Sequence, residues 1–271
     1  GSVTTQTQVV SQVLGIPMDH IECVQADTDS TLWDMGNYSS RGTFVSCSAA
    51  LKVASQVREE LLKEASGLLE RPVEDLDMGE ECVVSLSDPE ASASLAEVIR
   101  YAKQAHGRDI CCADTFASCA MAVSYGAHFT KVRVDMETGE VKVLEHTAVH
   151  DIGKAINPMA VEGQIEGAAQ MGLGYALTEG LILDEKGKVK NFTLKQYHML
   201  NSQEMPLIRV GMVERIEKSG PFGAKSIGEC SVVPVAAAVA NAVSNAIGAQ
   251  IHQIPMRPGS VKKVIEENQG K

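Results

Sequence analysis

Apolar residues recur at helical spacing over residues 5–15, and Gly15 and Pro17 follow directly, so this pattern predicts a helix that ends at Gly15. The same spacing returns over residues 44–67, where Ala, Val and Leu are frequent, and in a shorter form over residues 94–104. The first part of the chain is therefore predicted to contain three helices.

Three other stretches of this region lack helical spacing. Residues 21–27 are a short mixed run that is consistent with a strand, and residues 82–86 predict a second strand inside an acidic, turn-rich stretch. Residues 27–43 are polar and follow neither period; a loop of that length is usually functional or disordered. Aromatic side chains in or beside this loop favour order: Trp33, Tyr38 and Phe44.

The middle of the chain changes to the two-residue period of strands. Valines alternate with polar residues on both sides of the turn signal 137–139, which predicts a β-hairpin. A second hairpin is predicted around residues 185–187.

Two glycine-rich segments follow. Residues 160–180 have helical spacing but contain five glycines, each of which costs about 1 kcal/mol in a helix relative to Ala. So many glycines predict the close approach of another backbone or of a ligand. Residues 219–230 form a glycine-punctuated loop that leads into an apolar helix over residues 232–248.

Helices and strands are interspersed, and hairpins are prominent. This order predicts an α+β or mixed α/β fold. Nothing in the composition marks a clean boundary, so we expect one lobe over residues 1–271, with a subdivision near residues 115–150.

Composition narrows the class of protein. A net charge of -11 argues against nucleic-acid binding, which needs clustered Lys and Arg. No run approaches the roughly 18 apolar residues of a membrane span, and the first residues lack the regions of a signal peptide, so we expect a cytoplasmic protein. Seven cysteines without CxxC spacing predict neither a zinc nor an iron–sulfur site, and adjacent Cys111 and Cys112 are expected to be buried.

Glu229 is the first candidate for chemistry. It follows Gly228 and precedes the apolar helix, where the helix N-terminus would favour its ionised form and the apolar flank would disfavour it. The residues alone favour a simpler interpretation, in which Glu229 is a helix-capping acid.

The loop at residues 36–43 collects hydroxyls, an amide and a guanidinium around two glycines. Such groups can bind phosphate or a polar heterocycle. The alternative is a turn in which Ser39 or Ser40 caps the following helix.

Three further residues allow two interpretations each. His150 and Asp151 could transfer protons, although hydrogen bonding within the fold is the stronger prediction. Gln170 could donate to a ligand or pair with the backbone.

Taken together, four segments resemble the molybdenum hydroxylases, the family of xanthine dehydrogenase, aldehyde oxidoreductase and nicotinate dehydrogenase. In family order they are residues 1–17, 27–43, 150–180 and 220–229, followed by an Ala-rich helix. The resemblance covers nearly the whole chain and implies the C-terminal part of a molybdopterin-binding region.

The resemblance implies a role for Glu229, because the family's active-site glutamate lies in such a GAKxxGE loop. As a general base it would take a proton from the Mo–OH group while the oxygen attacks an electron-poor carbon and hydride passes to the Mo=S sulfur. Cys230 departs from the family pattern, in which a proline commonly follows the glutamate.

The resemblance also implies a cofactor site. It assigns contacts with the pyranopterin to Asn37, Ser40, Arg41, Gly42, Gln170 and Gly228, and none of these residues would bind the metal directly. Tyr38 and Ser39 would face the substrate. Met171 stands where the family usually has a glycine.

The cofactor implied is molybdopterin with Mo, in a dinucleotide form such as the cytosine dinucleotide. Implied partners are an upstream molybdopterin-binding segment or subunit, together with iron–sulfur and flavin (FAD) portions on other domains or subunits. Self-association of the chain stays open. Because these partners are needed for the full site, the chain alone is expected to be inactive.

The residues and the resemblance leave two main functions open. The first is hydroxylation of a heteroaromatic compound, purine-like or nicotinate-like, or of an aldehyde. The second is a non-catalytic assembly lobe, against which the retained Glu229 and Gln170 argue. A metal-free hydrolase is a distant third, because no nucleophile–base pair can be assigned.

Overall fold

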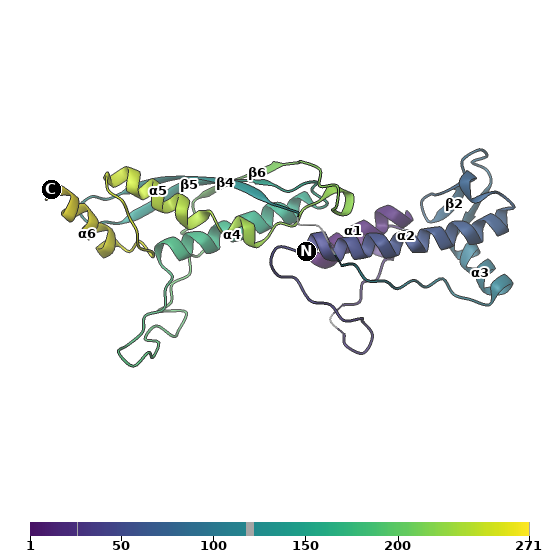
Figure 1. The fold of residues 1–271 in the computed structure, drawn as a ribbon, viewed down its shortest axis with the longest axis horizontal. Coiled ribbons are helices and arrows are strands. Elements are labelled where there is room, and N and C mark those ends of the chain that lie inside the picture. The colour runs from purple at the N-terminus through teal and green to yellow at the C-terminus, as the bar shows by residue number, and fades with distance from the viewer. Residues whose placement is uncertain (26, 118–121, 271) are drawn as a thin grey trace. The chain divides into compact units, whose positions relative to one another are not determined.

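A computed structural model describes residues 1–25, 27–117 and 122–270. Helices and small sheets are interspersed, which confirms the predicted α+β class (Figure 1). The chain forms two compact units. Unit 1 comprises Gly1–Ala122 and Glu217–Lys225, and unit 2 comprises Val123–Ile216 and Ser226–Lys271.

Unit 1 is built on two helices that pack against each other, α1 (Ser2–Leu14) and α2 (Gly42–Leu69). α1 ends as predicted at Gly15, whose φ of 65° is left-handed and whose N–H donates to Ser11 O. A shorter helix, α3 (Leu95–His106), begins with a complete capping box between Ser94 and Glu97.

An antiparallel sheet completes unit 1, with β2 (Cys82–Ser85) between β1 (Leu76–Met78) and β3 (Ser92–Ser94). The unit also contains the 3₁₀ turns η1 (Met18–His20) and η2 (Val73–Asp75), and η3 (Pro221–Gly223) in its second segment. The core consists of Leu14, Ala54, Leu61, Leu62, Ala65, Leu76, Val83, Ala93 and Val98.

Two predictions for this unit are wrong. Residues 21–25 form no strand. Their side chains are mostly exposed, so strand pairing here would gain no stability from a buried face. Cys111 is exposed and Cys112 is half-buried, and both are free thiols rather than buried apolar residues. Cys119 lies outside the described residues.

A buried carboxylate links α2 to the end of α3. Glu64 is only 2% exposed. Arg108 donates to both Glu64 and Glu60 at 2.5 Å, and the His106 ring nitrogen lies 2.8 Å from Glu64. Burial by itself would raise the pKa of Glu64, but the hydrogen bonds from Arg108 and His106 outweigh it and lower that pKa.

We therefore expect Arg108→Met to destabilise the protein, because the buried Glu64 carboxylate would keep only His106 as a partner. The measurement is the urea midpoint of unfolding. The matched control is Lys103→Met, whose ion pair with Asp109 is exposed on both sides and contributes little. Equal midpoints for the two variants would show that the Glu64 cluster is not stabilising.

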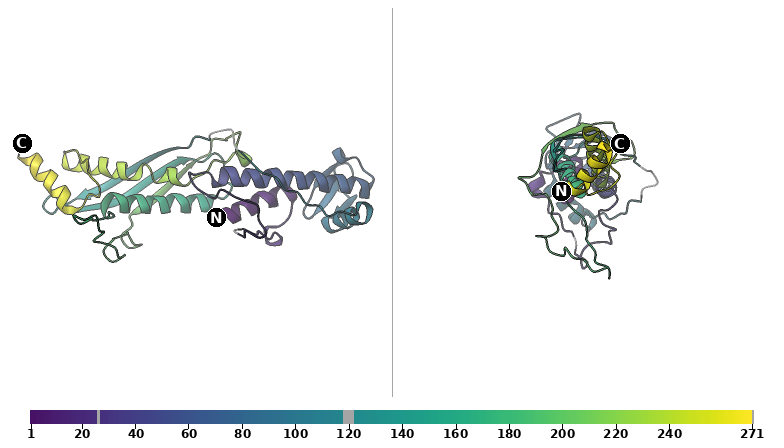
Figure 2. Two further views of the ribbon diagram at one scale, coloured as in Figure 1. Left: turned by 60° about the horizontal axis from the view of Figure 1, so that its bottom comes forward. Right: turned by 90° about the vertical axis from the view of Figure 1, so that its left-hand side faces the viewer.

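Unit 2 contains a three-stranded sheet with helices against one face (Figures 1 and 2). β4 (Tyr125–Val134) and β5 (Val141–Asp151) form the predicted hairpin. β6 (Leu207–Val213) adds a parallel strand beside β5, which no pattern had predicted.

The helices of unit 2 are α4 (Pro158–Leu177), α5 (Val235–Ile247) and α6 (Pro258–Gln269), and the 3₁₀ turn η4 (Glu229–Ser231) precedes α5. Buried residues of these helices, of the segment before α6 and of β5 form the core of the unit: Val143, Leu173, Ala176, Val235, Val239, Val243, Ile247, Met256, Val261 and Ile265. The second predicted hairpin is reduced to one antiparallel bridge, between Leu183 and Val189.

One segment of unit 2, Glu229–Ile247, is long and apolar enough by composition alone to cross a membrane. Its regular helix α5 has only 13 residues, short of the roughly 20 that a span needs. Val235, Val239 and Val243 are buried at four-residue spacing in the core, and this packing accounts for the apolar character.

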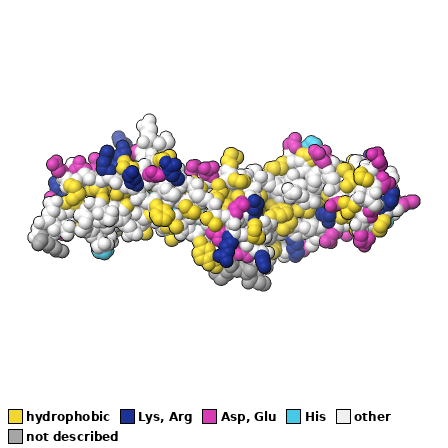
Figure 3. All heavy atoms as spheres, turned by 90° about the horizontal axis from the view of Figure 1, so that it is seen from above, with side chains coloured by type: hydrophobic (Ala, Val, Ile, Leu, Met, Phe, Trp, Pro, Cys, Tyr) yellow, Lys and Arg dark blue, Asp and Glu magenta, His cyan; other side chains and the backbone are white. Residues whose placement is uncertain are grey.

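Charged side chains of both signs are present on the surface. On the face seen in Figure 3, Lys and Arg side chains are scattered among Asp and Glu rather than joined in a continuous basic band. This distribution agrees with the net charge of -11.

Candidate functional site

In unit 1, the loop before α2 brings Asn37 against the first turn of that helix. A Cβ at position 42 would lie 2.7 Å from Oδ1 of Asn37, so only glycine lets the amide pack there. Ser39 and Ser40 have φ values of 51° and 50°, and these two left-handed residues turn the chain into the helix.

Arg41 is held by two neighbours on the same loop. Its Nη1 lies 3.0 Å from the Tyr38 hydroxyl and 3.6 Å from Sδ of Met35, and its guanidinium stands 5.1 Å from the centre of the Tyr38 ring. Tyr38 thus orients Arg41, a contact that the sequence pattern did not reveal. Met35 was not predicted to belong to the site at all.

The N-terminus of α2 differs from the prediction that Ser39 or Ser40 caps it. Arg41 is the N-cap residue and makes no capping hydrogen bond with its side chain. Ser39 and Ser40 precede the N-cap position, so neither of them is the cap residue. Helix N-termini favour anions because backbone N–H groups point outward there, so the loop and α2 can accept a negatively charged group.

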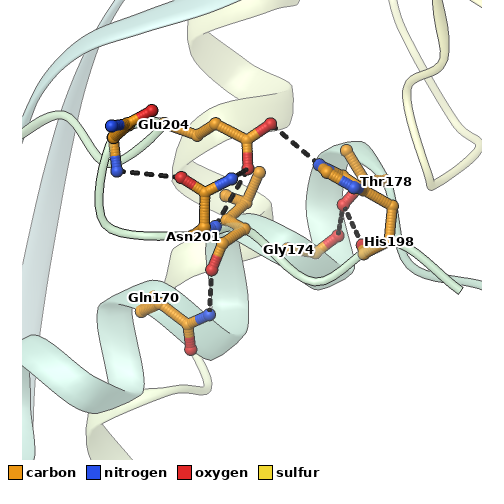
Figure 4. A network of polar contacts seen from close by, with 8 residues as sticks. Gln170, Gly174, Thr178, His198, Asn201 and Glu204 are labelled. Atoms are coloured by element: carbon orange, nitrogen blue, oxygen red, sulfur yellow. Dashed lines mark hydrogen bonds and ion pairs between the residues drawn. The ribbon is translucent and has the colours of Figure 1, made fainter. Parts of the chain in front are cut away.

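In unit 2, Gln170 lies on α4 and is half-buried. Its Nε2 donates to the backbone oxygen of Leu200 at 2.8 Å. Thr178 Oγ1 donates to the His198 oxygen at 2.8 Å, so α4 binds the same segment twice (Figure 4). Gln170 therefore pairs with backbone, the second of its two predicted interpretations, and its Oε1 accepts from no residue that the structure describes.

The segment that Gln170 holds is itself cross-linked. Glu204 accepts from the backbone N–H and the side-chain amide of Asn201 and lies 2.9 Å from the His198 ring nitrogen (Figure 4). These contacts make the segment a rigid turn. The sequence shows no signal that this segment meets α4, since Leu200 is 30 residues from Gln170 in the chain.

The glycines of α4 serve two purposes. A Cβ at Gly172 would lie 2.4 Å from Cβ of Val235, so this glycine allows the close approach of α5 that the pattern predicted. Gly163 and Gly167 meet nothing within 4 Å and leave part of the helix surface open. Met171, which replaces the family's usual glycine, is exposed and disturbs no packing.

Glu229 begins the turn η4, and its side chain is exposed. The turn is anchored by Ser231, which is fully buried and whose hydroxyl donates to Gly228 O at 2.5 Å. α5 begins only at Val235, with Pro234 as its N-cap, so the interpretation of Glu229 as the capping acid is wrong. The expected desolvation by the apolar flank is also absent.

Two of the predicted site elements lie together. η4, with Gly228 directly before it and Glu229 in it, contacts α4, which carries Gln170. Asn37 belongs to unit 1, and its convergence with Gln170 and Glu229 stays a prediction.

His150 does not pair with Asp151. Its Nε2 lies 2.7 Å from the His128 ring, and Asp151 Oδ1 accepts from the N–H of Gly153. The stronger prediction, hydrogen bonding within the fold, is confirmed.

Comparison with known proteins identifies the family. The family model described as "Molybdopterin cofactor-binding domain" matches residues 1–206 of the chain. The chain belongs to this family of molybdopterin cofactor-binding domains. The predicted resemblance to the molybdenum hydroxylases is thereby confirmed.

Relatives of this domain are subunits of oxidoreductases. The putative xanthine dehydrogenase molybdenum-binding subunit of Escherichia coli K12 is 30% identical over 98% of the chain and 36% of that protein. Subunit gamma of the 6-hydroxypseudooxynicotine dehydrogenase complex of Paenarthrobacter nicotinovorans is 30% identical over 96% of the chain and 34% of that protein.

Solved structures share the fold of the domain. Quinoline 2-oxidoreductase from Pseudomonas putida 86 matches with a TM-score of 0.89 and 30% identity, over 98% of the chain and 35% of that protein. Carbon monoxide dehydrogenase from Oligotropha carboxidovorans matches with a TM-score of 0.90 and 25% identity, over 99% and 34%. The chain thus spans about a third of the length of these relatives.

Proposed function

We propose that this domain works as part of a cytoplasmic molybdenum hydroxylase, where it supplies Glu229 as the base and one part of the cofactor site. The observation that supports the proposal is the contact between η4, the turn that begins with Glu229, and α4, the helix that carries Gln170. These two residues are far apart in sequence, and a purely structural lobe requires neither.

The residues of unit 1 fit a molybdopterin dinucleotide, such as the cytosine form, in their chemistry. The cofactor's phosphates are anionic, and the loop offers a guanidinium, hydroxyls and the N-terminus of α2. Gly42 leaves room for the Asn37 side chain to pack against the start of α2. Asn37, Ser40, Arg41 and Gly42 would hold the cofactor there, and Tyr38 would act mainly by orienting Arg41.

In unit 2, Gln170 fits the cofactor through Oε1, because its Nε2 is engaged with Leu200. The bound molybdenum centre would supply the transferred oxygen and accept two electrons from the substrate. Glu229 would accept the proton released as the oxygen becomes nucleophilic. Ser231 and Gly228 would keep the carboxylate in place by closing the turn.

The names of the relatives favour a heteroaromatic substrate over an aldehyde. They include xanthine, hypoxanthine, nicotine and quinoline enzymes, besides carbon monoxide and aldehyde enzymes. We infer partners from the same relatives: further molybdopterin-binding sequence, and iron–sulfur and flavin portions that would carry the electrons away.

We expect the 271-residue chain alone to bind no stoichiometric molybdenum and to hydroxylate nothing, whereas co-production with the remaining two thirds of such a subunit restores both. The test is molybdenum and nucleotide content per mole of protein, measured for the chain alone and for the complex. A complex that folds but lacks molybdenum would support the assembly lobe instead.

A further inference from the structure

Three histidines form a buried hydrogen-bonded row between β4 and β5. His146 and His150 are 0% and 1% exposed, and His128 is half-buried between them. His128 Nδ1 lies 3.0 Å from His146 Nε2, and His128 Nε2 lies 2.7 Å from His150 Nε2. Thr130 Oγ1 ends the row, 2.8 Å from His146 Nδ1.

The other end of the row is closed by backbone. A Cβ at Gly126 would lie 2.4 Å from the His150 ring, so a glycine is required beneath it. His150 Nδ1 is buried and forms no hydrogen bond of normal geometry with any residue that the structure describes. In the neutral row this nitrogen can stay without a proton, because Nε2 of the same ring can carry the hydrogen of the contact with His128.

This geometry limits how many protons the row can hold. Each of the two ring-to-ring contacts accommodates one hydrogen, because two N–H groups cannot face each other at hydrogen-bonding distance. The two end nitrogens can carry one hydrogen each. The row therefore holds four hydrogens at most, against three in the neutral rings, so the folded state accepts at most one added proton.

We propose that His128, His146 and His150 form an acid-sensitive histidine latch that clasps β4 to β5 and opens when a second proton enters. β4 is also connected to the turn that begins with Glu229. The turn η4 contacts β4, and the hydroxyl of Ser124, just before β4, lies 3.4 Å from Ser226 O. Opening the latch would therefore release the turn that holds Glu229.

Among the residues that the structure describes, no acidic side chain forms a hydrogen bond with the three rings, and Asp151, next to His150 on β5, accepts from the N–H of Gly153. Of the elements packed on these strands, α5 has no titratable residue, α4 contributes only the exposed Glu162, Glu166 and Tyr175, and η4 contributes Glu229 and Cys230. On β6, Arg209 alternates to the other face, where it pairs with Glu145.

The pKa values agree with this geometry. Burial lowers the pKa of His128 to about 4, with the two neighbouring rings adding to the effect. Burial also lowers the pKa of His146 and of His150, and for His150 the backbone at Tyr125 partly opposes the shift. No carboxylate among the described residues contributes to any of these shifts.

The direction of the pH dependence follows from proton binding. In the opened chain each histidine binds a proton near pH 6.5, whereas the closed row binds at most one in all. The opened state thus takes up at least two more protons, so stability is complete above pH 6.5 and is lost as pH falls below it. When the pH falls from 7.5 to 5, the uptake of two protons raises the equilibrium constant for opening about 10³-fold.

The test is amide hydrogen exchange of the full chain, followed by mass spectrometry from pH 7.5 to 5 and corrected for intrinsic exchange rates. We expect the logarithm of the opening constant of β4 and of the Ser226–Ser231 turn to rise by at least two per unit of falling pH at the acid end. His128→Gln keeps a donor and an acceptor but removes the central ring, and we expect its slope to fall to one or less.

The matched control is His252→Gln, which changes an exposed histidine in the same unit and should keep the wild-type slope. A wild-type slope near zero, or an unchanged slope in His128→Gln, would overturn the proposal. If His128→Gln fails to fold, nitrogen NMR of the wild-type rings decides: two rings protonated in the folded protein would refute the latch.

Discussion

Replacing Glu229 by Gln in the complete enzyme should leave molybdenum bound and lower turnover by at least about 10²-fold, and by 10⁴-fold or more if the base generates the nucleophile. Gln has the size of Glu and can form hydrogen bonds, but it cannot accept the proton. Glu229 is exposed on a turn whose closure depends on Ser231 and Gly228, so folding should be unaffected.

Turnover and molybdenum content are measured together for this variant. A loss in kcat at constant molybdenum content would mark an interaction made in the transition state rather than in cofactor binding. The control is Glu267→Gln, the same change on the exposed face of α6. Wild-type turnover in Glu229→Gln with full molybdenum content would remove Glu229 from the mechanism.

Replacing Gly172 by Ala should lower the free energy of unfolding by about 1–3 kcal/mol, the usual cost of overpacking a core. The added methyl would lie 2.4 Å from Cβ of Val235, a rigid β-branched side chain that cannot swing away. α4 and α5 would have to move apart, and the contact that positions η4 on α4 would move with them.

Gly167→Ala is the matched control on the same helix. It meets nothing within 4 Å, so the higher helix propensity of Ala should raise stability by up to about 1 kcal/mol. Urea unfolding of both variants gives the difference directly. If Gly172→Ala were as stable as Gly167→Ala, the α4 glycines would not be needed for helix packing.

Local chemistry explains which elements could be predicted. Gly15 ends α1 because its left-handed φ suits glycine, and the valines on both sides of Gly139 form the hairpin because alternate side chains face one core. The family could be predicted as well, since its motifs are short runs whose order survives in the chain.

Other features depend on partners that are distant in the sequence. β6 pairs with β5 although some 60 residues separate their paired positions, and nothing in its own seven residues specifies that partner. Gln170 depends on Leu200 in the same way. A sequence pattern reports only which face of a segment is apolar and does not contain the register of a partner strand.

The sequence by itself determined the helices α1 to α5, the first hairpin and the family, because capping, periodicity and motif order act over a few residues. The helix α6 was not predicted. The tertiary structure alone decided that Glu229 is exposed on its own turn, that Arg41 rests on Tyr38, and that three histidines meet under one sheet. Exposure, ring contacts and proton capacity depend on distances between side chains, and those distances exist only after the strands and helices have packed.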